Sequence, residues 1–594
     1  MRFKKRICLL LIFLLLEVVS FGCSSPQADE KMVDHSISEE KNMQNSIKIQ
    51  MIHFDKSFYH PGESIHLMLD IENDDGKKSV ILHYEIRAVA QLVIGKEFEI
   101  TLEKGINEIQ LDIVLDLPAP HGYGLDIWIE SADSEQMAEL SSGFDVLNKW
   151  TETPRYGFLT NFSPNRQDIV TTIQALSDYH INGLQFYDWM YRHDQFLTTQ
   201  DSYLDPLGRE LSIQTVNKLI ESAHEFNMTA MPYTAIYAAS IPFSQGHPEM
   251  ALYDRNGNPL MFGDNFLAYM STKADSPWLD HLMTQFKAIL QNTDFDGIHL
   301  DQYGDPKVGY DADGNEFDLA ISLADTIDLT KEVVEEERKN GTVIFNAVNN
   351  WPIETVAPSN QDLVYIEVWS PYDWFSDIAT LITEAQDLGE GKPIVIAAYL
   401  DPSYSHNLLL LDAVIFASGA SHIELGEDAA LLAEAYFPNY RYPSQETNAK
   451  LQTYYDFMVR YQDVIGPRTK DVTSKFSKNI VLEGYDSSQS LQTNKIMLVI
   501  RGGESFTAIN LINFVGVEQA EWKQEIIDAP LHVEDLPVHV ETGERKIKRV
   551  LFATPDSESI QFQELEFVSE ANSEVTIFVP DLYYWDLILI EWEE

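Results

Sequence analysis

Apolar and polar positions follow three successive patterns along this chain. Between residues 48 and 150, short runs such as SVILHYEIRAV (79–89) and IQLDIVLDL (109–117) alternate apolar with polar positions, and Gly, Pro, Asn and Asp separate the runs. A period of two places one face of each strand against a core and the other in water. We therefore predict a β-sandwich over residues 48–150.

The turn after the first run makes this prediction more specific. The segment YHPGE (59–63) places Pro and Gly between two strand-like pieces, and these residues favour tight turns. It resembles the opening turn of immunoglobulin-like modules on bacterial surface proteins. We expect the N-terminal sandwich to be immunoglobulin-like.

The second pattern, over residues 151–466, alternates apolar strand-like runs with helical stretches. The predicted strands are 156–162, 183–189, 229–237, 297–301, 342–348, 363–369, 393–400 and 421–426. The predicted helices are near 167–178, 212–226, 276–290, 318–338, 375–387, 405–418 and 447–463. Eight strands alternating with helices favour a (β/α)₈ TIM barrel. A doubly wound sheet is the alternative, but no Gly-rich phosphate turn follows the first strand.

The third pattern, over residues 467–594, returns to short β-like runs, among them NIVLEGY, IMLVIRG, TAINLIN and SEVTIFV. We predict a second β-sandwich there. The fold class is therefore a multidomain protein, with a central TIM barrel between an N-terminal and a C-terminal β-sandwich.

The first 47 residues have the pattern of an export segment and a tether. Basic residues precede a short apolar run, ICLLLIFLLL, which is too short to span a bilayer. Residues 1–22 resemble a bacterial lipoprotein signal peptide, cut before Cys23, whose thiol then carries lipid. Residues 23–47 are polar and aperiodic, which is typical of a flexible linker. We expect a lipid-anchored protein at the outer face of the cell membrane; simple secretion is the alternative.

The net charge of the chain limits the classes of molecule that it can bind. The chain has 41 Lys and Arg against 94 Asp and Glu, a net charge of −53. Such a surface repels nucleic acid and anionic lipids, so we expect no nucleic-acid partner and a membrane contact only through the lipid anchor. Of the only two cysteines, Cys8 leaves with the signal peptide and the thiol of Cys23 carries lipid, so we expect the mature chain to have no disulfide, no thiolate nucleophile and no cysteine metal site.

Polar and aromatic residues gather where the predicted barrel strands end, and barrel enzymes keep their active sites at that edge. These residues are Asn161, Tyr187, Asp188, Trp189, His193, Tyr233, Tyr237, Asp301, Tyr303, Asn346, Asn349, Glu367, Trp369, Tyr399, Asp401, Glu424, Glu427 and Asp428. Aromatic faces stack on sugar rings, and Asn, Asp and His hydrogen-bond hydroxyl groups. The pattern favours a site for a neutral carbohydrate.

Glycosidic bonds are usually cleaved by two carboxyl groups. Asp301 ends the fourth predicted strand, and Glu367 lies near the end of the sixth. Strands four and six are near neighbours in a barrel, so these carboxyls can face each other. The apolar and aromatic surroundings of Glu367 raise its pKa, as a general acid requires. Asp301 lies beside polar Gln302 and is expected to stay ionised. The structural alternative is that both residues only end their strands.

Three segments, LQFYDWMYRHD (184–194), FDGIHLDQYG (295–304) and VYIEVW (364–369), resemble the conserved blocks of glycoside hydrolase family 66. This family holds endo-dextranases and cycloisomaltooligosaccharide glucanotransferases, which act on α-1,6-glucan with retention. The resemblance implies that Asp301 is the nucleophile and Glu367 the acid/base. It also implies that Tyr187, Asp188 and His193 bind sugar near the cleavage point. Tyr303, Asn349 and Trp369 are further substrate-contact candidates by position alone.

Within the family, the cyclising transferases carry a carbohydrate-binding module inserted after the acid/base residue. Here only about 55 residues separate Glu367 from the eighth predicted strand, enough for two strand–helix units. The expected function is therefore endo-hydrolysis of dextran by a monomer. The alternatives are cyclising transglycosylation, another α-glucan substrate, and a non-catalytic α-glucan-binding lipoprotein. We expect no cofactor or metal, and we interpret the acidic segment DADGNEFD (311–318) as a turn.

Overall fold

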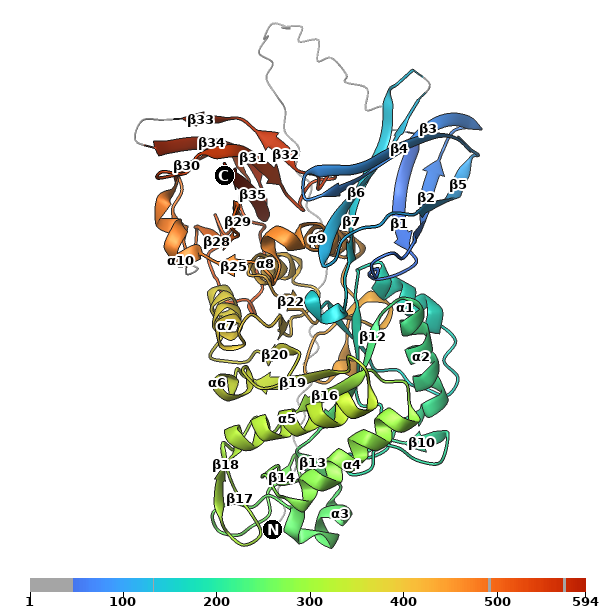
Figure 1. Ribbon diagram of the computed structural model, residues 1–594, viewed down its shortest axis with the longest axis vertical. Coiled ribbons are helices and arrows are strands. Elements are labelled where there is room, and N and C mark those ends of the chain that lie inside the picture. Colours follow the sequence, from blue (N-terminus) through green and yellow to red (C-terminus); the bar gives the residue numbers. More distant parts are fainter. Residues whose placement is uncertain (1–45, 132, 490–492, 570–572, 594) are drawn as a thin grey trace, which may run out of the picture. The chain divides into compact units, whose positions relative to one another are not determined.

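The computed structural model describes residues 46–131, 133–489, 493–569 and 573–593. The predicted signal peptide, Cys23 and almost all of the predicted linker lie outside these residues. Within these ranges, no helix combines the length and the apolar character needed to span a bilayer. The described chain is a mostly-β protein of several parts (Figure 1).

The N-terminal part consists of two antiparallel sheets. One has the order β1-β2-β5 and the other the order β4-β3-β6-β7. Their strands are β1 (Ile47–Phe54), β2 (Ile65–Asn73), β3 (Lys78–Ala88), β4 (Gln91–Leu102), β5 (Gly105–Ile113), β6 (His121–Glu130) and β7 (Gln136–Val146). Alternate residues of β2 and β3, such as Leu69, Ile71, Leu82 and Ile86, are fully buried in one shared core. The period-two pattern of the sequence therefore packs the two sheets face to face.

The YHPGE segment forms the predicted turn. The backbone N–H of Glu63 donates to the carbonyl of His60 at 3.0 Å, and Gly62 has a φ of +83°. Glycine adopts this left-handed conformation without a steric penalty. Tyr59 is buried, and its hydroxyl donates to Asp55 at 2.7 Å, so the turn is fixed to the core beside it.

The central part is built on a ten-stranded sheet with the order β22-β21-β20-β19-β16-β12-β9-β8-β23-β24. Its strands are β8 (Tyr156–Leu159), β9 (Gly183–Phe186), β12 (Thr229–Ala235), β16 (Gly297–Asp301), β19 (Thr342–Val348), β20 (Leu363–Glu367), β21 (Ile394–Ala397), β22 (Ser421–His422), β23 (Leu425–Gly426) and β24 (Ala430–Leu431). All neighbouring pairs from β22 to β23 are parallel. Each of the eight predicted strands contains one of these strands, except that the last, 421–426, contains both β22 and β23.

The two ends of the parallel run come from one short segment of the chain. Strand β22 pairs with β21, whereas β23 pairs with β8. Only Ile423 and Glu424 separate β22 from β23. The segment 421–426 thus connects the last strand of the run to the first.

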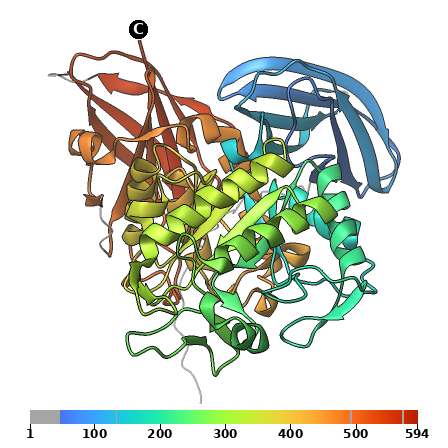
Figure 2. The same ribbon diagram turned by 60° about the horizontal axis from the view of Figure 1, so that its bottom comes forward.

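Helices lie between the strands, as the sequence predicts. They are α1 (Ile169–Ser177), α2 (Ile213–Glu225), α4 (Pro277–Asn292), α5 (Leu319–Glu337), α7 (Phe375–Leu388), α8 (Ser405–Ala417) and α9 (Gln445–Ile465), with short α3 (Ile241–Gly246) and α6 (Ile353–Val356). Ser212, Ser276 and Ser444 cap α2, α4 and α9 by accepting a backbone N–H of the first turn. Figure 2 shows α4 and α5 lying side by side across the parallel strands.

Short hairpins extend the connections between strands and helices. They are β10 (Ser202–Leu204) with β11 (Glu210–Ser212), β13 (Ala238–Ala239) and β14 (Met261–Phe262) with β15 (Leu267–Tyr269), and β17 (Val308–Tyr310) with β18 (Glu316–Asp318). In the acidic segment 311–318, residues 311–315 form the turn of the last hairpin, as predicted, whereas Glu316–Asp318 is strand β18. Asp311 accepts hydrogen bonds from Lys273 and Asn315, and these donors lower its pKa to about 2.

The C-terminal part also has two sheets. The larger has the order β25-β28-β29-β35-β31-β32, with β27 beside β28, and the smaller has the order β26-β30-β34-β33. Their strands are β25 (Lys470–Asp471), β26 (Ile480–Leu482), β27 (Ser487–Ser488), β28 (Ile496–Gly502), β29 (Phe506–Asn513), β30 (Val533–Glu541), β31 (Ile547–Ala553), β32 (Gln563–Leu565), β33 (Phe567–Ser569), β34 (Glu574–Leu582) and β35 (Trp585–Trp592); α10 is Thr473–Phe476. Their facing side chains form one core.

Helix α8 has no polar face, because it is covered on both sides. Every residue from Asn407 to Ala417 is buried. The helix packs against α7 and α9 within the central part and against β28 and β29 of the C-terminal part. Its leucines share one apolar cluster with Val499 and Ile512 of those strands. The central and C-terminal parts therefore have a continuous core.

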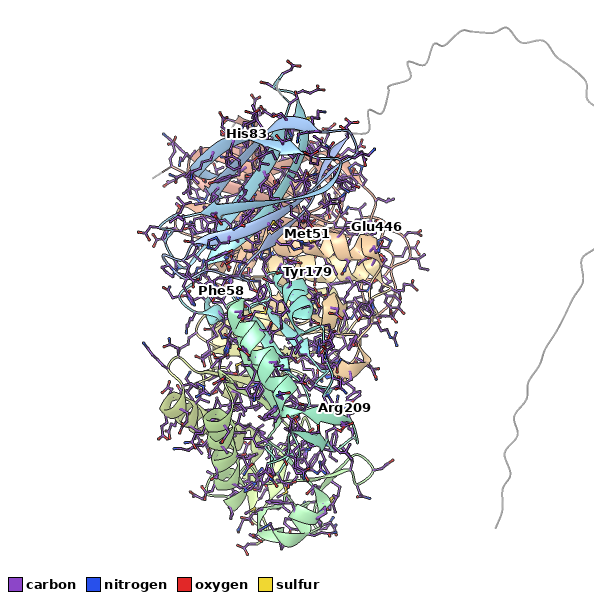
Figure 3. The ribbon with its side chains drawn as sticks, turned by 90° about the vertical axis from the view of Figure 1, so that its right-hand side faces the viewer. Met51, Phe58, His83, Tyr179, Arg209 and Glu446 are labelled. Carbon is purple, nitrogen blue, oxygen red and sulfur yellow. The ribbon has the colours of Figure 1, made fainter. Side chains whose placement is uncertain are left out.

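Helix α9 supports the N-terminal part. In Figure 3, Met51 of β1 and Glu446 at the start of α9 mark the two elements. Arg460 of α9 is fully buried and donates two hydrogen bonds to Asp126 of β6, at 2.7 and 2.9 Å. A Cβ atom at Gly124 would lie 2.3 Å from the guanidinium carbon of Arg460. Glycine is required there because the strand backbone lies directly on the arginine.

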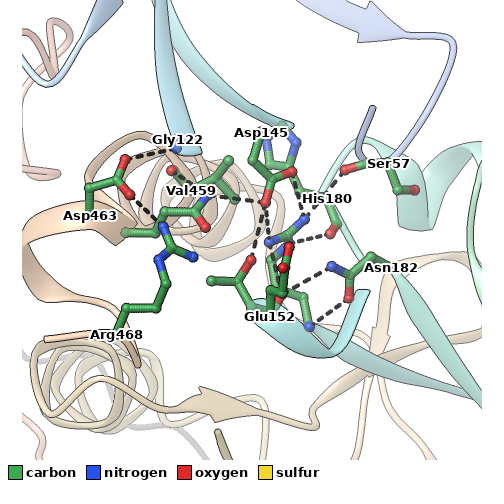
Figure 4. Close-up of polar contacts among 12 residues, drawn as sticks. Ser57, Gly122, Asp145, Glu152, His180, Asn182, Val459, Asp463 and Arg468 are labelled. Atoms are coloured by element: carbon green, nitrogen blue, oxygen red, sulfur yellow. Dashed lines mark hydrogen bonds and ion pairs between the residues drawn. The ribbon is translucent and has the colours of Figure 1, made fainter. Parts of the chain in front are cut away.

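A second buried ion pair joins β7 to the start of β8. Asp145, labelled in Figure 4, accepts from both terminal nitrogens of Arg155, at 2.8 and 3.1 Å, and also from the Gln462 amide of α9 at 3.0 Å. Both charged groups are shielded from water. Removing one partner leaves an uncompensated charge in a medium of low dielectric constant.

We expect Arg155→Met to destabilise the folded chain by about 3–5 kcal/mol, because Asp145 loses its counter-charge. Urea unfolding followed by tryptophan fluorescence measures the loss. Lys287→Met, which removes an exposed ion pair with Glu336, is the control and should change stability far less. A loss at Arg155 no larger than that of the control would contradict this account.

Candidate active site

A cavity of about 790 Å³ lies at the carboxyl ends of the parallel strands. Asp301 and Glu367, the last residues of β16 and β20, line it together with Tyr187 and Asp188, which follow β9. Parallel strands bring their carboxyl ends to one edge, so residues distant in the sequence meet there. The other lining residues used below are His193, Arg209, Tyr233, Tyr237, Phe262, Phe266, Tyr303, Asn346, Val348, Trp369, Tyr399, Tyr436 and Phe437.

The carboxylate of Asp301 is held by two donors. The Tyr233 hydroxyl donates to Oδ2 at 2.6 Å, and the Asn346 amide donates to Oδ1 at 2.9 Å. Burial and the nearby Glu367 raise the pKa of Asp301 to about 7, although these hydrogen bonds oppose the rise. The polar neighbours expected from the sequence are present, but burial outweighs them. Burial therefore works against the ionised form that the sequence predicts, and with a pKa of about 7 both protonation states of Asp301 are populated near neutral pH.

The carboxylate of Glu367 is also buried and hydrogen-bonded. Asn346 donates to Oε2 at 2.8 Å, and the Trp369 indole N–H donates to Oε1 at 2.9 Å. The Tyr399 hydroxyl is a further donor. Burial raises the pKa of Glu367 above its ordinary value, as the apolar and aromatic sequence around it predicts.

One amide nitrogen connects the two carboxyl groups. Asn346 lies on β19, which pairs with β16 on one side and β20 on the other. Its Nδ2 has two hydrogens, and it donates to both Asp301 and Glu367. The two accepting oxygens are therefore at most about 5.7 Å apart. The structure thus brings together the two carboxyls that the sequence singled out.

Tyr187, Asp188 and His193 all line the same cavity. Tyr187 stacks on Phe437, with ring centroids 4.3 Å apart. Burial raises the pKa of Asp188 to about 6 and lowers that of His193 to about 4. The Nδ1 atom of His193 has no hydrogen-bond partner among the described residues. A neutral imidazole with a free nitrogen can bind a hydroxyl group.

The three candidates chosen by position differ in their placement. Trp369 lines the cavity, is 37% exposed and hydrogen-bonds Glu367. Tyr303 lines it too, but its hydroxyl already bonds the Met270 carbonyl and the Thr272 N–H, so only its ring faces the cavity. Asn349 is not among the lining residues; its amide donates to the Ser370 carbonyl. Asn349 follows the end of β19, whereas Asn346 and Val348 occupy the strand positions that line the cavity.

Several cavity residues come from loops that the sequence pattern does not single out. Arg209 follows the β10–β11 turn and pairs with Asp205 at 2.7 Å (labelled in Figure 3). Phe262 and Phe266 lie in the β14–β15 hairpin and are about 40% exposed. Tyr436 and Phe437 belong to the segment before α9. Loops have no hydrophobic period, so aromatic content is the one signal that could have found the Phe and Tyr residues, and no sequence signal singles out Arg209.

Two of the acidic residues noted at the predicted rim have structural contacts instead. Glu427 is buried and pairs with Arg166 at 2.7 Å. Glu424 is buried outside the cavity, where it accepts from the Tyr455 hydroxyl of α9 at 3.0 Å. It also lies close to His422, whose Nδ1 is 2.9 Å from Asp412 of α8.

Asp412, His422 and Glu424 are the one group of acidic and histidine side chains, within the described ranges, that is close enough to hold a metal ion. Both ring nitrogens of His422 are engaged, one by Asp412 and the other by the Ala398 carbonyl. The two carboxyl groups raise the pKa of His422 to about 10. A protonated imidazole has no free lone pair for a metal, so we interpret this group as a buried ion cluster.

Two buried carboxyls thus face an aromatic cavity at the end of a parallel sheet, an arrangement that glycoside-cleaving enzymes use. The family model of glycosyl hydrolase family 66 matches residues 54–589. The chain therefore belongs to glycosyl hydrolase family 66, and the family resemblance drawn from the three sequence segments is confirmed.

Three relatives illustrate the similarity. A cycloisomaltooligosaccharide glucanotransferase of Niallia circulans is 22% identical over 703 residues, covering 91% of this chain and 72% of the relative. A dextranase of Streptococcus salivarius is 22% identical over 560 residues, covering 79% of this chain and 67% of the relative. The crystal structure of a Paenibacillus sp. cycloisomaltooligosaccharide glucanotransferase with cycloisomaltoheptaose is 20% identical, with a TM-score of 0.85, and covers 91% of this chain and 100% of that one. The last comparison shows a shared fold.

We expect Asp301→Asn to stabilise the folded protein, and to do so more at pH 8 than at pH 5. The folded-state pKa of about 7 exceeds the ordinary value of 3.8, so the native state binds more protons than the unfolded state between these values. Wild-type stability therefore falls as the pH rises from about 4 to 7. At about 1.4 kcal/mol per pKa unit, the extra gain at pH 8 is about 2–3 kcal/mol.

Urea unfolding of both proteins at pH 5 and pH 8 measures this difference. Glu335→Gln, which alters an exposed carboxylate on α5, is the matched control. A gain at Asp301 that is equal at the two pH values would show that this carboxyl is not strained by burial.

Proposed function

We propose that this protein is a retaining endo-dextranase, which hydrolyses α-1,6-glucosidic bonds within dextran to isomalto-oligosaccharides. The observation that supports this most directly is the shared Asn346 amide, which keeps Asp301 and Glu367 oxygens within about 5.7 Å. Retaining glycosidases place their carboxyls about 5–5.5 Å apart, whereas inverting ones leave about 6.5–9.5 Å for a water molecule. The bound on this distance favours retention.

In this mechanism Asp301 attacks the anomeric carbon, and Glu367 donates its proton to the departing glycosidic oxygen. A covalent glucosyl ester on Asp301 results, and Glu367 is left ionised. The ester is uncharged, so the repulsion that Glu367 feels from an Asp301 carboxylate disappears at that point. Glu367 can then take a proton from water, whose oxygen displaces Asp301 and restores both groups.

Asn346 suits both halves of this cycle. Its two amide hydrogens stabilise negative charge on either carboxyl. When the charge moves from Asp301 to Glu367, no side chain has to move to follow it. Tyr233 on Asp301 and Trp369 on Glu367 provide each carboxyl with a donor of its own.

The rest of the cavity supports a glucan substrate. Aromatic rings of Tyr187, Tyr303 and Trp369 give the apolar faces of glucose rings surfaces to pack on, and Asp188 and His193 can bind hydroxyls. The dextranase of Streptococcus salivarius and the glucanotransferases are named for activities on such glucans. A net charge of −53 suits a neutral polymer.

We also propose the finer fold assignments. The parallel run of strands forms a closed (β/α)₈ barrel, because residues 421–426 pair with both of its ends. The N-terminal part is an immunoglobulin-like sandwich, supported by its three-stranded and four-stranded antiparallel sheets. The domain ranges 48–150, 151–466 and 467–594 follow from these assignments.

Two observations favour hydrolysis over cyclisation. After Glu367, the chain forms α7, β21 and α8 before β22, with no further domain between them. The alignment with the Niallia circulans transferase spans 703 residues, whereas this chain has 594. The transferase thus contains at least about a hundred residues without a counterpart here. Export, lipidation at Cys23, a monomeric state and an outer membrane-surface location are part of the same proposal, on sequence grounds alone.

The test of the function is to incubate purified residues 24–594 with dextran and to follow reducing ends and product masses. We expect a rapid fall in polymer size and linear isomalto-oligosaccharides with free reducing ends. Products one water lighter with few new reducing ends would show cyclisation instead. Dextran that is bound but never cleaved would contradict the enzyme assignment.

The roles of the two carboxyls are separable with azide. Glu367→Gln should lower dextran cleavage by about 10²–10⁴-fold and should respond to azide by forming the α-glycosyl azide, since Asp301 still forms its ester. In Asp301→Asn, azide should attack in place of the nucleophile and give the β-glycosyl azide from an activated substrate. Proton NMR of the anomeric position distinguishes the two, and exchanged configurations would reverse the assignment.

A further inference from the structure

The long connection between β29 and β30 reaches from the C-terminal part onto the edge of the active-site cavity. It covers residues 514–532. Trp522, near its centre, is fully buried, and its indole N–H donates to the Tyr372 carbonyl at 2.9 Å. Tyr372 lies in the segment between Glu367 and α7. A C-terminal loop is therefore built into the surroundings of Glu367, the proposed acid/base.

This loop is fixed on both sides of residue 523. On one side, the backbone N–H of Trp522 donates to the Asp373 carbonyl, and the backbone N–H of Phe375 donates to the Ala520 carbonyl. On the other, the buried Asn407 of α8 donates to the carbonyls of Trp522 and Gln524, at 3.0 and 2.7 Å, and accepts from Ile526 at 2.8 Å. Such anchoring gives the intervening residue one defined position.

Lys523 is that residue. Its Nζ lies 4.4 Å from the ring centroid of Trp522 and 5.1 Å from that of Trp369, and 3.5 Å from the Val368 carbonyl. An ammonium group over an indole face is attracted by the ring. Trp369 in turn donates its indole N–H to Glu367. The ammonium thus lies beside the indole ring that donates to the Glu367 Oε1 atom.

The charged and titratable neighbours of this arrangement come from several elements. Around Glu367 they are Asp301 of β16, Tyr187 after β9, Tyr237 after β12, Tyr365 of β20, Tyr399 after β21 and Lys523. Around Lys523 they are Asp373 and Glu367. Lys523 lowers the pKa of Glu367 against the stronger effect of burial. Arg209, which also lines the cavity, already pairs with Asp205.

We propose that Lys523 is a positioning residue for Glu367: from the C-terminal part, its ammonium group orients Trp369 against the Glu367 carboxyl. The inference rests on the acid/base role of Glu367 proposed above. Lys523 does not transfer a proton or touch the reacting atoms. It offsets part of the burial penalty, so that Glu367 can ionise once the leaving group has taken its proton.

The test compares Lys523→Met, which keeps an apolar chain and removes the charge, with Lys523→Arg, which keeps the charge. For kcat/KM on dextran, we expect the alkaline limb of the pH profile to move up by about half a unit to one unit in Lys523→Met, because Glu367 loses a nearby cation. Lys523→Arg should restore most of the wild-type profile. Lys546→Met, an exposed lysine of the same part, is the control.

A second substrate, isomaltosyl fluoride, distinguishes a lost effect on Glu367 from general damage to the active site. Fluoride leaves without protonation, so Lys523→Met should lower the first step on dextran about tenfold and the first step on the fluoride by less than about threefold. Equal losses on both substrates, or an unmoved alkaline limb, would overturn the proposal. Glu367→Gln is run in parallel: if it cleaves dextran like the wild type, the acid/base assignment fails and the proposal with it. If Glu367→Gln is inactive and the pH profile of Lys523→Met matches that of the wild type, the acid/base assignment stands and only the Lys523 proposal is overturned.

Discussion

The active site depends on one constraint, the burial of two carboxyl groups within about 5.7 Å of each other. Two charges at this distance and out of water repel strongly, so the surroundings must neutralise one of them by protonation or stabilise them with donors. Asn346 supplies donors to both, and Tyr233, Trp369 and Tyr399 supply the rest. The parallel order β16-β19-β20 makes the arrangement possible, because it places the amide between the two acids.

The register of the sheet fixes the relative positions of the two carboxyl groups and the amide between them, because these side chains come from strands and not from loops. Asp301, Asn346 and Glu367 lie on three adjacent strands of a buried sheet. Hydrogen bonds between strands fix their relative heights to a fraction of a residue, and the packed core behind them leaves no room to adjust. The loops supply the aromatic lining of the cavity and the Lys523 side chain. Loops can change in sequence more freely than buried strands.

The strands, the helices and the two acidic residues can be predicted from the local sequence pattern. The residues that contact those two acids in the folded protein cannot. Every predicted strand of the central part contains an observed one, because apolar runs bounded by turn residues leave few alternatives. Asp301 and Glu367 stood out as charged residues ending apolar runs. Asn349 was chosen instead of Asn346 because the pattern does not show which residue of the strand faces the cavity. The raised pKa of Asp301 depends on burial by residues far away in the sequence, and Lys523 acts from a different part of the chain.

Helix α8 gives the chain a folding order. It is buried along its length from Asn407 to Ala417, and two of its neighbours, β28 and β29, are synthesised only after about 80 more residues. Until those strands emerge, the nascent central part exposes a row of leucines to water, where other chains can bind them. The sequence pattern changes near residue 466, but the parts of the chain on either side of it complete one core together. The C-terminal part supplies the last layer of a core that it shares with the central part.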